Sequence, residues 1–307
     1  MRFVLALAAL GVIGAVHARM TALPTVLAAT AHAPTGAASA TGADGDDWEL
    51  TFHDDFNGAS LNKAVWRVRA NESHCCPQEL QLYVEDEVFV QGGDLVLRTR
   101  RRSARDGRGN HFNYTSGWVD TETLWAQRYG KFEVRARLPW RANVTALWPA
   151  HWLMPDPGQC EHHFHGDKAR CCWPVGGEID IMEMISPFPY AAGTYRRAQN
   201  ATCCCGDNVQ VLPGGLYPPG PGGNDTYFAD TYHRYQVTWE ATAMHFGIDD
   251  VVYHSVGVPQ TYVPETPFYW ILNTAVAPWV PPAPPPAPFP DVEHRIDWVK
   301  VWRRRTP

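Results

Sequence analysis

Between Trp48 and Trp302 the chain consists of short runs in which apolar and polar residues alternate, separated by turn residues. In FEVRA, residues 132–136, the apolar side chains share one face of a strand, and Glu133 and Arg135 share the other. LVLRTRR, YQVTWE, MHFGID, VVYHSV and RIDWVKVW alternate similarly or are rich in β-branched and aromatic residues. No helical pattern longer than about ten residues stands out. The pattern predicts an all-β protein, a β-sandwich of jelly-roll type with two packed antiparallel sheets and a concave cleft.

Two segments rich in proline and glycine, residues 212–223 and 278–290, interrupt this pattern. Both are interpreted as surface loops, because proline cannot join a central strand ladder. The second segment could alternatively be a linker, but the strand RIDWVKVW after it leaves no room for a second domain. We therefore expect one domain over residues 48–303.

The N-terminus has the pattern of a secretory signal peptide. A basic start, MR, precedes the apolar run FVLALAALGVIGAV, and residues 16–18 form a small-x-small cleavage site; a second such site ends at Ala33. Arg19 and Pro24 interrupt the apolar run well short of the ~20 residues that a membrane anchor needs. We predict a signal peptide over 1–18, a flexible leader over 19–47, and a secreted monomer without a membrane anchor.

The eight cysteines fall into three clusters. An even number of cysteines in a secreted chain favours disulfides, and neighbours in sequence seldom pair with each other, so we expect bridges between clusters. A zinc site at His162, His163 and His165 is the alternative, but adjacent cysteines lack the C-x₂₋₄-C spacing of structural zinc sites. The first cluster is Cys75 and Cys76, the second is Cys160, Cys171 and Cys172, and the third is Cys203, Cys204 and Cys205.

The net charge and the tryptophan count indicate which classes of partner the protein binds, and its sequons fit secretion. The formal net charge of −6 argues against nucleic acid, whose phosphates need a basic surface. The 13 tryptophans fit a protein that binds sugar rings by their flat faces, although tryptophan also fills cores. N-x-Ser/Thr sequons, which fit a secreted glycoprotein, begin at Asn71, Asn113, Asn143, Asn200 and Asn224.

The stretch GGEIDIMEM, residues 176–184, carries three acids with irregular spacing. Glu178 and Asp180 lie on one strand face, whereas regular alternation would turn Glu183 toward the isoleucines. A one-residue bulge at Met182 would return Glu183 to the acidic face and place Met184 with the isoleucines. We therefore predict a bulged strand with three carboxyls on one face.

Carboxyl pairs of this kind suit glycoside hydrolysis. Retaining glycosidases use one carboxylate as nucleophile and a second carboxyl as acid and base, and a third between them can separate their pKa values. A solvated acidic strand face or a calcium site is the alternative interpretation.

GEIDIMEM resembles the signature of glycoside hydrolase family 16, in the bulged E-x-D-x-x-E form of its laminarinase-like branch, the endo-1,3-β-glucanases. The resemblance covers residues 48–303 roughly end to end. Other segments match in the family's order: FHDDFNG with Trp66, ELQLYVEDEVFVQGGDLVLRTRR, YTSGWVDT, YGKFEVRARLP, LWPAHWLMP, YHRYQVTWEATAMHFGIDD, FYWILNTAV and DWVKVW.

The resemblance implies roles for individual residues. Glu178 would be the nucleophile, Glu183 the general acid and base, and Asp180 would orient and tune them. No cofactor is implied for catalysis. Trp148 and Trp152, which share a strand face, match tryptophans near the family's cleft, where sugar stacking and core packing are both open. Arg135, Asn71 and Trp279 are candidate sugar contacts, and Asp297 aligns with an acid that binds a structural calcium in relatives.

The chain also departs from the family pattern. Residues 193–196 read GTYR where many members have G-T-x-H with a histidine that lines the cleft. Residues 275–278 read AVAP before Trp279 where members have AVGG, and the insertion SHCCPQ before ELQ leaves Asn71 and Gln78 as candidates for a usual asparagine. These changes bear on the substrate more than on the reaction.

We therefore expect a secreted, retaining endo-β-glucanase that hydrolyses β-1,3 or mixed-linkage 1,3/1,4 glucans such as laminarin. The alternatives are a non-catalytic β-glucan-binding lectin on the same fold, and a galactan hydrolase or transglycosylase of the same family. The presence of all three acids favours an enzyme.

Overall fold

The computed structural model describes residues 47–72, 79–140, 144–159, 173–198, 209–211, 214–218, 220, 226–258, 263–277 and 288–305. The predicted signal peptide, nearly all of the leader, the eight cysteines and the three histidines of the zinc alternative lie outside these residues. So do Gln78, Trp279 and the sequons at Asn143, Asn200 and Asn224, whereas Asn71 and Asn113 are described and exposed. Within the described residues, no helix is both long and apolar enough to cross a membrane.

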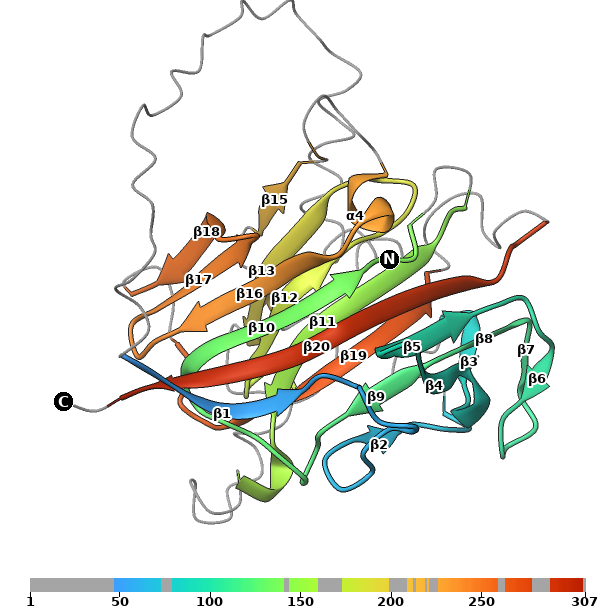
Figure 1. Ribbon diagram of the computed structural model, residues 1–307, viewed down its shortest axis with the longest axis horizontal. Coiled ribbons are helices and arrows are strands. Elements are labelled where there is room, and N and C mark those ends of the chain that lie inside the picture. Colours follow the sequence, from blue (N-terminus) through green and yellow to red (C-terminus); the bar gives the residue numbers. More distant parts are fainter. Residues whose placement is uncertain are drawn as a thin grey trace, which may run out of the picture.

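Two eight-stranded antiparallel sheets pack face to face, as the alternating pattern predicts (Figure 1). We refer to the sheet that contains β20 as sheet A and to the sheet that contains β12 as sheet B. Sheet A has the order β18 (Val251–Gly257), β17 (Ala243–Ile248), β16 (His233–Trp239), β10 (Gly130–Arg137), β20 (Val292–Arg304), β5 (Asp94–Thr99) and β4 (Val88–Gln91), with β1 (Trp48–Asp54) paired to β20.

Sheet B lies behind sheet A in Figure 1 and carries the acidic stretch. Its order is β14 (Val209–Val211), β13 (Ala191–Ala198), β12 (Glu178–Glu183), β11 (Leu147–Pro155), β19 (Phe268–Val276), β9 (Trp118–Asp120) and β2 (Arg67–Val68), with β15 (Gly215–Tyr217) paired to β13.

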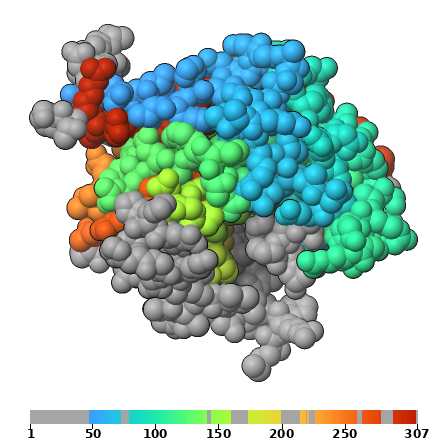
Figure 2. Space-filling view, turned by 90° about the horizontal axis from the view of Figure 1, so that it is seen from below, coloured from blue at the N-terminus to red at the C-terminus, as the bar shows by residue number. Residues whose placement is uncertain are grey.

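Small elements complete the described chain. The space-filling view shows the segments from β1 to β8 together on one flank of the molecule, coloured blue to teal (Figure 2). The remaining elements are β3 (Gln81–Tyr83) paired in parallel with β8 (Tyr114–Ser116), the hairpin of β6 (Ala104–Arg105) and β7 (His111–Phe112), the 3-10 turn η1 (Glu85–Glu87) and the helix α4 (Tyr227–Asp230).

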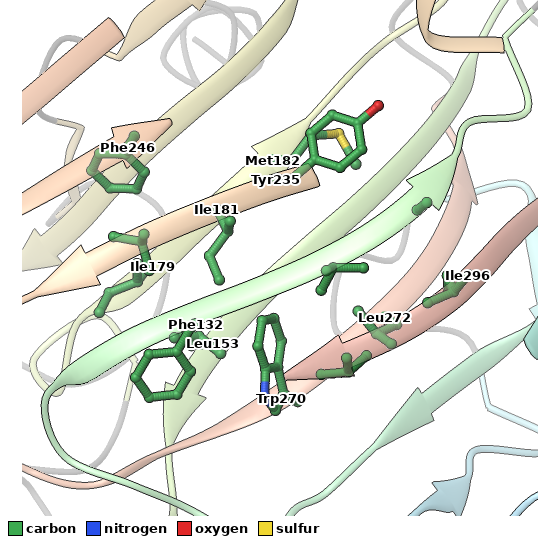
Figure 3. Close-up of a cluster of buried hydrophobic side chains, with 14 of the residues drawn as sticks. Phe132, Leu153, Ile179, Ile181, Met182, Tyr235, Phe246, Trp270, Leu272 and Ile296 are labelled. Atoms are coloured by element: carbon green, nitrogen blue, oxygen red, sulfur yellow. The ribbon is translucent and has the colours of Figure 1, made fainter. Parts of the chain in front are cut away.

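The main core fills the space between the two sheets (Figure 3). Phe132 of β10 and Trp270 of β19, from opposite sheets, have ring centroids 5.7 Å apart and are fully buried. The apolar residues of FEVRA face this core, as predicted. Glu133, on the opposite face of β10, is also shielded from solvent and bonds Lys131 Nζ at 2.8 Å.

Candidate active site

Strand β12 carries a one-residue bulge between Asp180 and Glu183. On one side Asp180 faces Trp152 and Met182 faces the next residue of β11, His151, so Ile181 has no partner in the register. The ladder between β12 and β13 shows the same irregularity, between Asp180 and Glu183. The predicted bulge is therefore confirmed, although the unpaired residue is Ile181 and not Met182.

The bulge turns two successive side chains into the core. Ile181 and Met182 are both buried between the sheets, in the same core cluster as Tyr235 of sheet A (Figure 3). Because two inward side chains follow each other, the next residue, Glu183, returns to the face that Glu178 and Asp180 occupy. All three acids lie on the face of sheet B that is turned away from sheet A.

The backbone just before β12 is also constrained. Gly177 has a φ of +88°, a conformation that residues with a Cβ rarely adopt. An added Cβ would lie 3.1 Å from Oη and 3.2 Å from Cε2 of Tyr195, on the neighbouring strand β13. The glycine therefore allows the chain to enter β12 with Glu178 facing outward.

Arg196 of β13 joins the three acids into one cluster. It lies directly across from Glu178 in the β12–β13 ladder, so both side chains leave the sheet on the same face. Its Nε is 3.1 Å from Glu178 Oε1 and 2.8 Å from Asp180 Oδ2, and its Nη2 donates to Glu183 Oε2 at 2.5 Å. One guanidinium therefore contacts all three carboxyls, and its side chain is only 11% exposed.

Two tryptophans bind the outer oxygens of the glutamates. Trp148 Nε1 donates to Glu183 Oε1 at 3.1 Å, and Trp173 Nε1 donates to Glu178 Oε2 at 2.6 Å. With the contacts to Arg196, both oxygens of Glu183 have a donor, and Glu178 has the Trp173 donor and the ion pair with Arg196. These contacts fix the positions of both carboxyl groups.

Burial raises the pKa values of two of the three acids. Burial, together with the charges on Glu183 and Glu178, raises the pKa of Asp180 well above its ordinary value. Burial also raises the pKa of Glu178, while the opposite charge of Arg196 and a hydrogen bond with Asp180 act to lower it. Asp180 can therefore hold a proton that it shares with Glu178, which suits a residue that tunes a nucleophile.

Arg196 stays charged in this setting. Burial alone would lower the pKa of Arg196, but the charges on Glu183, Asp180 and Glu178 outweigh it and raise the pKa well above its ordinary value.

A row of polar and aromatic side chains continues from the acids across sheet B. Trp152, paired across from Asp180, donates through Nε1 to Asn273 Oδ1 at 2.8 Å, and Asn273 Nδ2 donates to the Tyr83 hydroxyl at 3.0 Å. Trp152 also packs edge to face with Trp118 at 5.5 Å between ring centroids. Its indole is 9% exposed, so packing holds it firmly, on the same face as the acids.

Asn71 does not reach the acid cluster. It is exposed, has a φ of +60°, and its backbone N–H donates to the carbonyl of Tyr83 at 2.8 Å. Asn71 therefore lies next to Tyr83, at the far end of the polar and aromatic row. Among the described residues, no contact joins its side chain to the three carboxyls.

Arg135 lies in the wrong sheet for the predicted sugar contact. Its neighbours along β10, Val134 and Ala136, face the core, so Arg135 points outward from sheet A with the core between it and the acids. Its guanidinium forms an ion pair with Asp297 and lies over the Tyr232 ring, 4.9 Å from the centroid. The physical reason is strand alternation, which fixes the side of the sandwich on which Arg135 emerges.

The same ion pair bears on the predicted calcium. Asp297 is the extra residue of an irregularity in the β10–β20 register, and its carboxylate is bound to Arg135. Within the described part of the chain, no group of three or more His, Cys, Asp or Glu residues is arranged to hold a metal ion. The structural calcium stays a prediction, and binding at Asp297 would have to displace Arg135.

The roles of three residues of this site were missed in the sequence. Arg196 was noted only as a departure from the family, although its place in GTYR, where many members have the histidine that lines the cleft, was the available signal. Trp173 lies five residues before Glu178, and Asn273 is the one amide in the apolar run FYWILNTAV. Which of these meets the acids depends on strand pairing, which the sequence alone does not specify.

Comparisons with known proteins show the family to which the chain is similar. Residues 14–176 match the family described as beta-glucan synthesis-associated protein SKN1/KRE6/Sbg1. The chain is 27% identical over 257 residues to glucan endo-1,3-beta-glucosidase A1 of Niallia circulans, covering 74% of this chain but only 33% of that protein. It is 28% identical over 245 residues to a glucan endo-1,3-beta-glucosidase of Cryptopygus antarcticus, covering 75% of this chain and 80% of the relative.

The fold is likewise similar to that of a solved structure. The laminarinase catalytic domain from Thermotoga maritima superposes with a TM-score of 0.69 at 25% sequence identity, over 85% of this chain and 100% of that domain.

Proposed function

The chain belongs to the family of beta-glucan synthesis-associated proteins SKN1/KRE6/Sbg1, within the laminarinase-like glycoside hydrolases of family 16, and we propose that it is a secreted, retaining endo-β-glucanase. Its substrate would be a β-1,3 or mixed-linkage 1,3/1,4 glucan such as laminarin. The observation that carries this proposal is the bulge of β12, which brings Glu178, Asp180 and Glu183 to one face of sheet B.

The reaction would proceed in two displacements. A carboxylate oxygen of Glu178 attacks the anomeric carbon while Glu183 gives a proton to the glycosidic oxygen, so the leaving sugar departs as an alcohol. Glu183, now ionised, takes a proton from water, and the resulting hydroxide breaks the glycosyl ester and restores Glu178 with retained configuration. Asp180, whose pKa burial raises, shares its proton with Glu178 and steadies the departing carboxylate.

Sugar binding would use the aromatic row beside the acids. Half-buried Trp148 is bonded to Glu183, and Trp152 is held by Asn273 and Trp118. Firmly packed indole rings present a flat apolar face with little loss of side-chain entropy, which suits pyranose rings. Trp148 is the favoured stacking residue because it is the more exposed of the two.

Secretion, disulfides and glycosylation complete the proposal and rest on sequence patterns. N-terminal sequencing of protein from the culture medium should begin at Arg19, or after Ala33 if the second site is used. Denatured, unreduced protein should show no free thiols. Retention of an uncleaved N-terminus in cells, or eight reactive thiols, would contradict this part.

The decisive experiment measures new reducing ends on laminarin, lichenan, xyloglucan, agarose and carrageenan. Glu178→Gln and Glu183→Gln, which keep side-chain shape but remove the ionisable oxygen, should each lower kcat by about a thousandfold or more on the accepted glucan. NMR of the first product should show the β-anomer, as retention requires. The α-anomer as first product would refute the retaining mechanism.

Two other functions are outcomes of the same panel. If the wild type and both Gln variants bind glucan equally and none releases reducing ends, the protein is a β-glucan-binding lectin. If galactans are cut, or transfer products exceed hydrolysis products, it is a galactan hydrolase or a transglycosylase.

A further inference from the structure

Arg196 occupies the centre of the acid cluster without a role in the two displacement steps. The charged or titratable groups that face it among described residues are the three carboxyls of β12, which account for its raised pKa. The neighbouring β11 and the segment before β12 contribute the indoles of Trp148 and Trp173, which bind the same glutamates.

The contacts of Arg196 conflict with the first catalytic step. Glu183 must carry a proton to protonate the glycosidic oxygen, yet its Oε2 accepts from Arg196 Nη2 at 2.5 Å and its Oε1 accepts from Trp148. Each carboxylate oxygen keeps a second lone pair, but a guanidinium on one oxygen and an N–H on the other both favour the ionised form over the protonated form. The contact with Arg196 therefore works against the protonated form that acid catalysis needs, and loss of this contact from Oε2 would favour that form.

The contacts with the other two acids explain how Arg196 can leave and return. Its Nε is held by Glu178 and Asp180 at 3.1 and 2.8 Å, whereas only Nη2 reaches Glu183. The planar guanidinium moves as one unit, so a rotation of the Arg196 side chain can turn Nη2 away from Glu183 while the charge stays beside Glu178 and Asp180. A sugar hydroxyl or the glycosidic oxygen can then take the vacated position.

We propose that Arg196 is a positioning residue, an internal counter-ion that favours the ionised forms of the glutamates in the free protein, is displaced from Glu183 by the bound glucan, and sets the pH range of the reaction. The proposal rests on the glucanase function proposed above. After displacement Glu183 takes a proton from solvent and passes it to the glycosidic oxygen, so the proton balance of the reaction is unchanged. With its positive charge beside both carboxyls, the enzyme works at lower pH than it would without Arg196.

The first test is the pH profile of kcat/KM for wild type, Arg196→Gln and Arg196→Lys. Loss of the positive charge should move both limbs of the bell upward by about one pH unit or more, because an opposite charge at this distance shifts a carboxyl by that amount. Lysine keeps the positive charge but lacks the planar guanidinium. The limbs of the Arg196→Lys profile should therefore move less than half as far as those of Arg196→Gln. Arg234→Gln, which removes an ion pair with Asp250 on sheet A, is the matched control and should leave the profile in place.

The proposal would be overturned if kcat falls in Arg196→Gln while both limbs of the pH profile stay at their wild-type pH values. Arg196 would then only support the fold or bind sugar. If the glutamine variant does not fold, the lysine variant decides: limbs that coincide with wild type and unchanged KM would overturn displacement from Glu183. A higher affinity for glucan in the lysine variant would support it, since less ion pairing has to be broken.

A second measurement does not need activity. In protein labelled with ¹³C at Glu and Asp carboxyls, the cluster signals can be assigned by their loss in Glu178→Gln and Glu183→Gln. Their titration midpoints should rise by about one pH unit or more in Arg196→Gln. If the wild type cuts no glucan but the midpoints rise, the glucanase function fails and the counter-ion role holds. Midpoints that do not move refute the counter-ion role whatever the activity.

Discussion

A buried pair of imidazoles links the two sheets, one of them on β11, the strand beside the acid strand. His151 of β11 and His294 of β20 have their Nε2 atoms 2.9 Å apart, with stacked rings at a 4.9 Å centroid distance, and both are fully buried. Burial lowers the pKa of His294 from 6.5 to about 3, and burial with the nearby His294 lowers the pKa of His151. Both rings are neutral in the folded protein.

The sign of the pH effect follows from this depression. Below pH 6.5 the unfolded chain takes up a proton at each histidine while the folded protein does not, so acid favours unfolding. Stability from His294 is complete above 6.5 and is lost as pH falls from 6.5 toward 3. Between pH 7.5 and pH 5 the loss from His294 alone is about 2 kcal/mol, or roughly 4–8 °C in Tm for a domain of this size.

Urea or thermal unfolding at pH 7.5, 6.5, 5.5 and 4.5 tests this in wild type and in His294→Gln, which keeps a polar group opposite His151. The variant should be less stable at pH 7.5, and its disadvantage should shrink by about 2 kcal/mol by pH 5. His111→Gln, at an exposed position on β7, is the control and should follow the wild-type slope. Equal pH slopes in wild type and His294→Gln would refute the argument.

Two further substitutions test the frame of the acid cluster. Gly177→Ala should cost about 1–3 kcal/mol in unfolding free energy, because a Cβ at a φ of +88° also meets Tyr195. Gly92→Ala, at a φ of +66° with open space around it, should cost less. Equal losses in the two variants would argue against a role for the contact with Tyr195. Trp148→Phe keeps an aromatic ring but removes the hydrogen bond to Glu183, so kcat on the accepted glucan should fall about 10- to 100-fold with little change in KM. A rise in KM at constant kcat would show instead that the indole mainly binds sugar.

The alternation of apolar and polar residues was enough to predict much of the fold. Segments such as FEVRA and RIDWVKVW form strands because their side-chain period of two matches a half-buried sheet, and they appear as β10 and β20. The same period revealed the bulge in GEIDIMEM, since the apolar phase of Ile179, Ile181 and Met184 allows Glu183 only one face. These are local properties, in which each residue's direction depends on its neighbours in sequence.

The pairing of strands was decided by the tertiary structure. Arg196 meets three carboxyls because β13 pairs with β12 in a register that sets it opposite Glu178. Arg135 faces away from the acids because β10 belongs to the other sheet, although its own strand pattern was read correctly. Local periodicity gives the face on which a side chain emerges, but register and sheet membership arise from burial summed over strands far apart in the chain. The three acids were therefore visible in the sequence, whereas the contacts of Arg196 with all three became visible only in the folded protein.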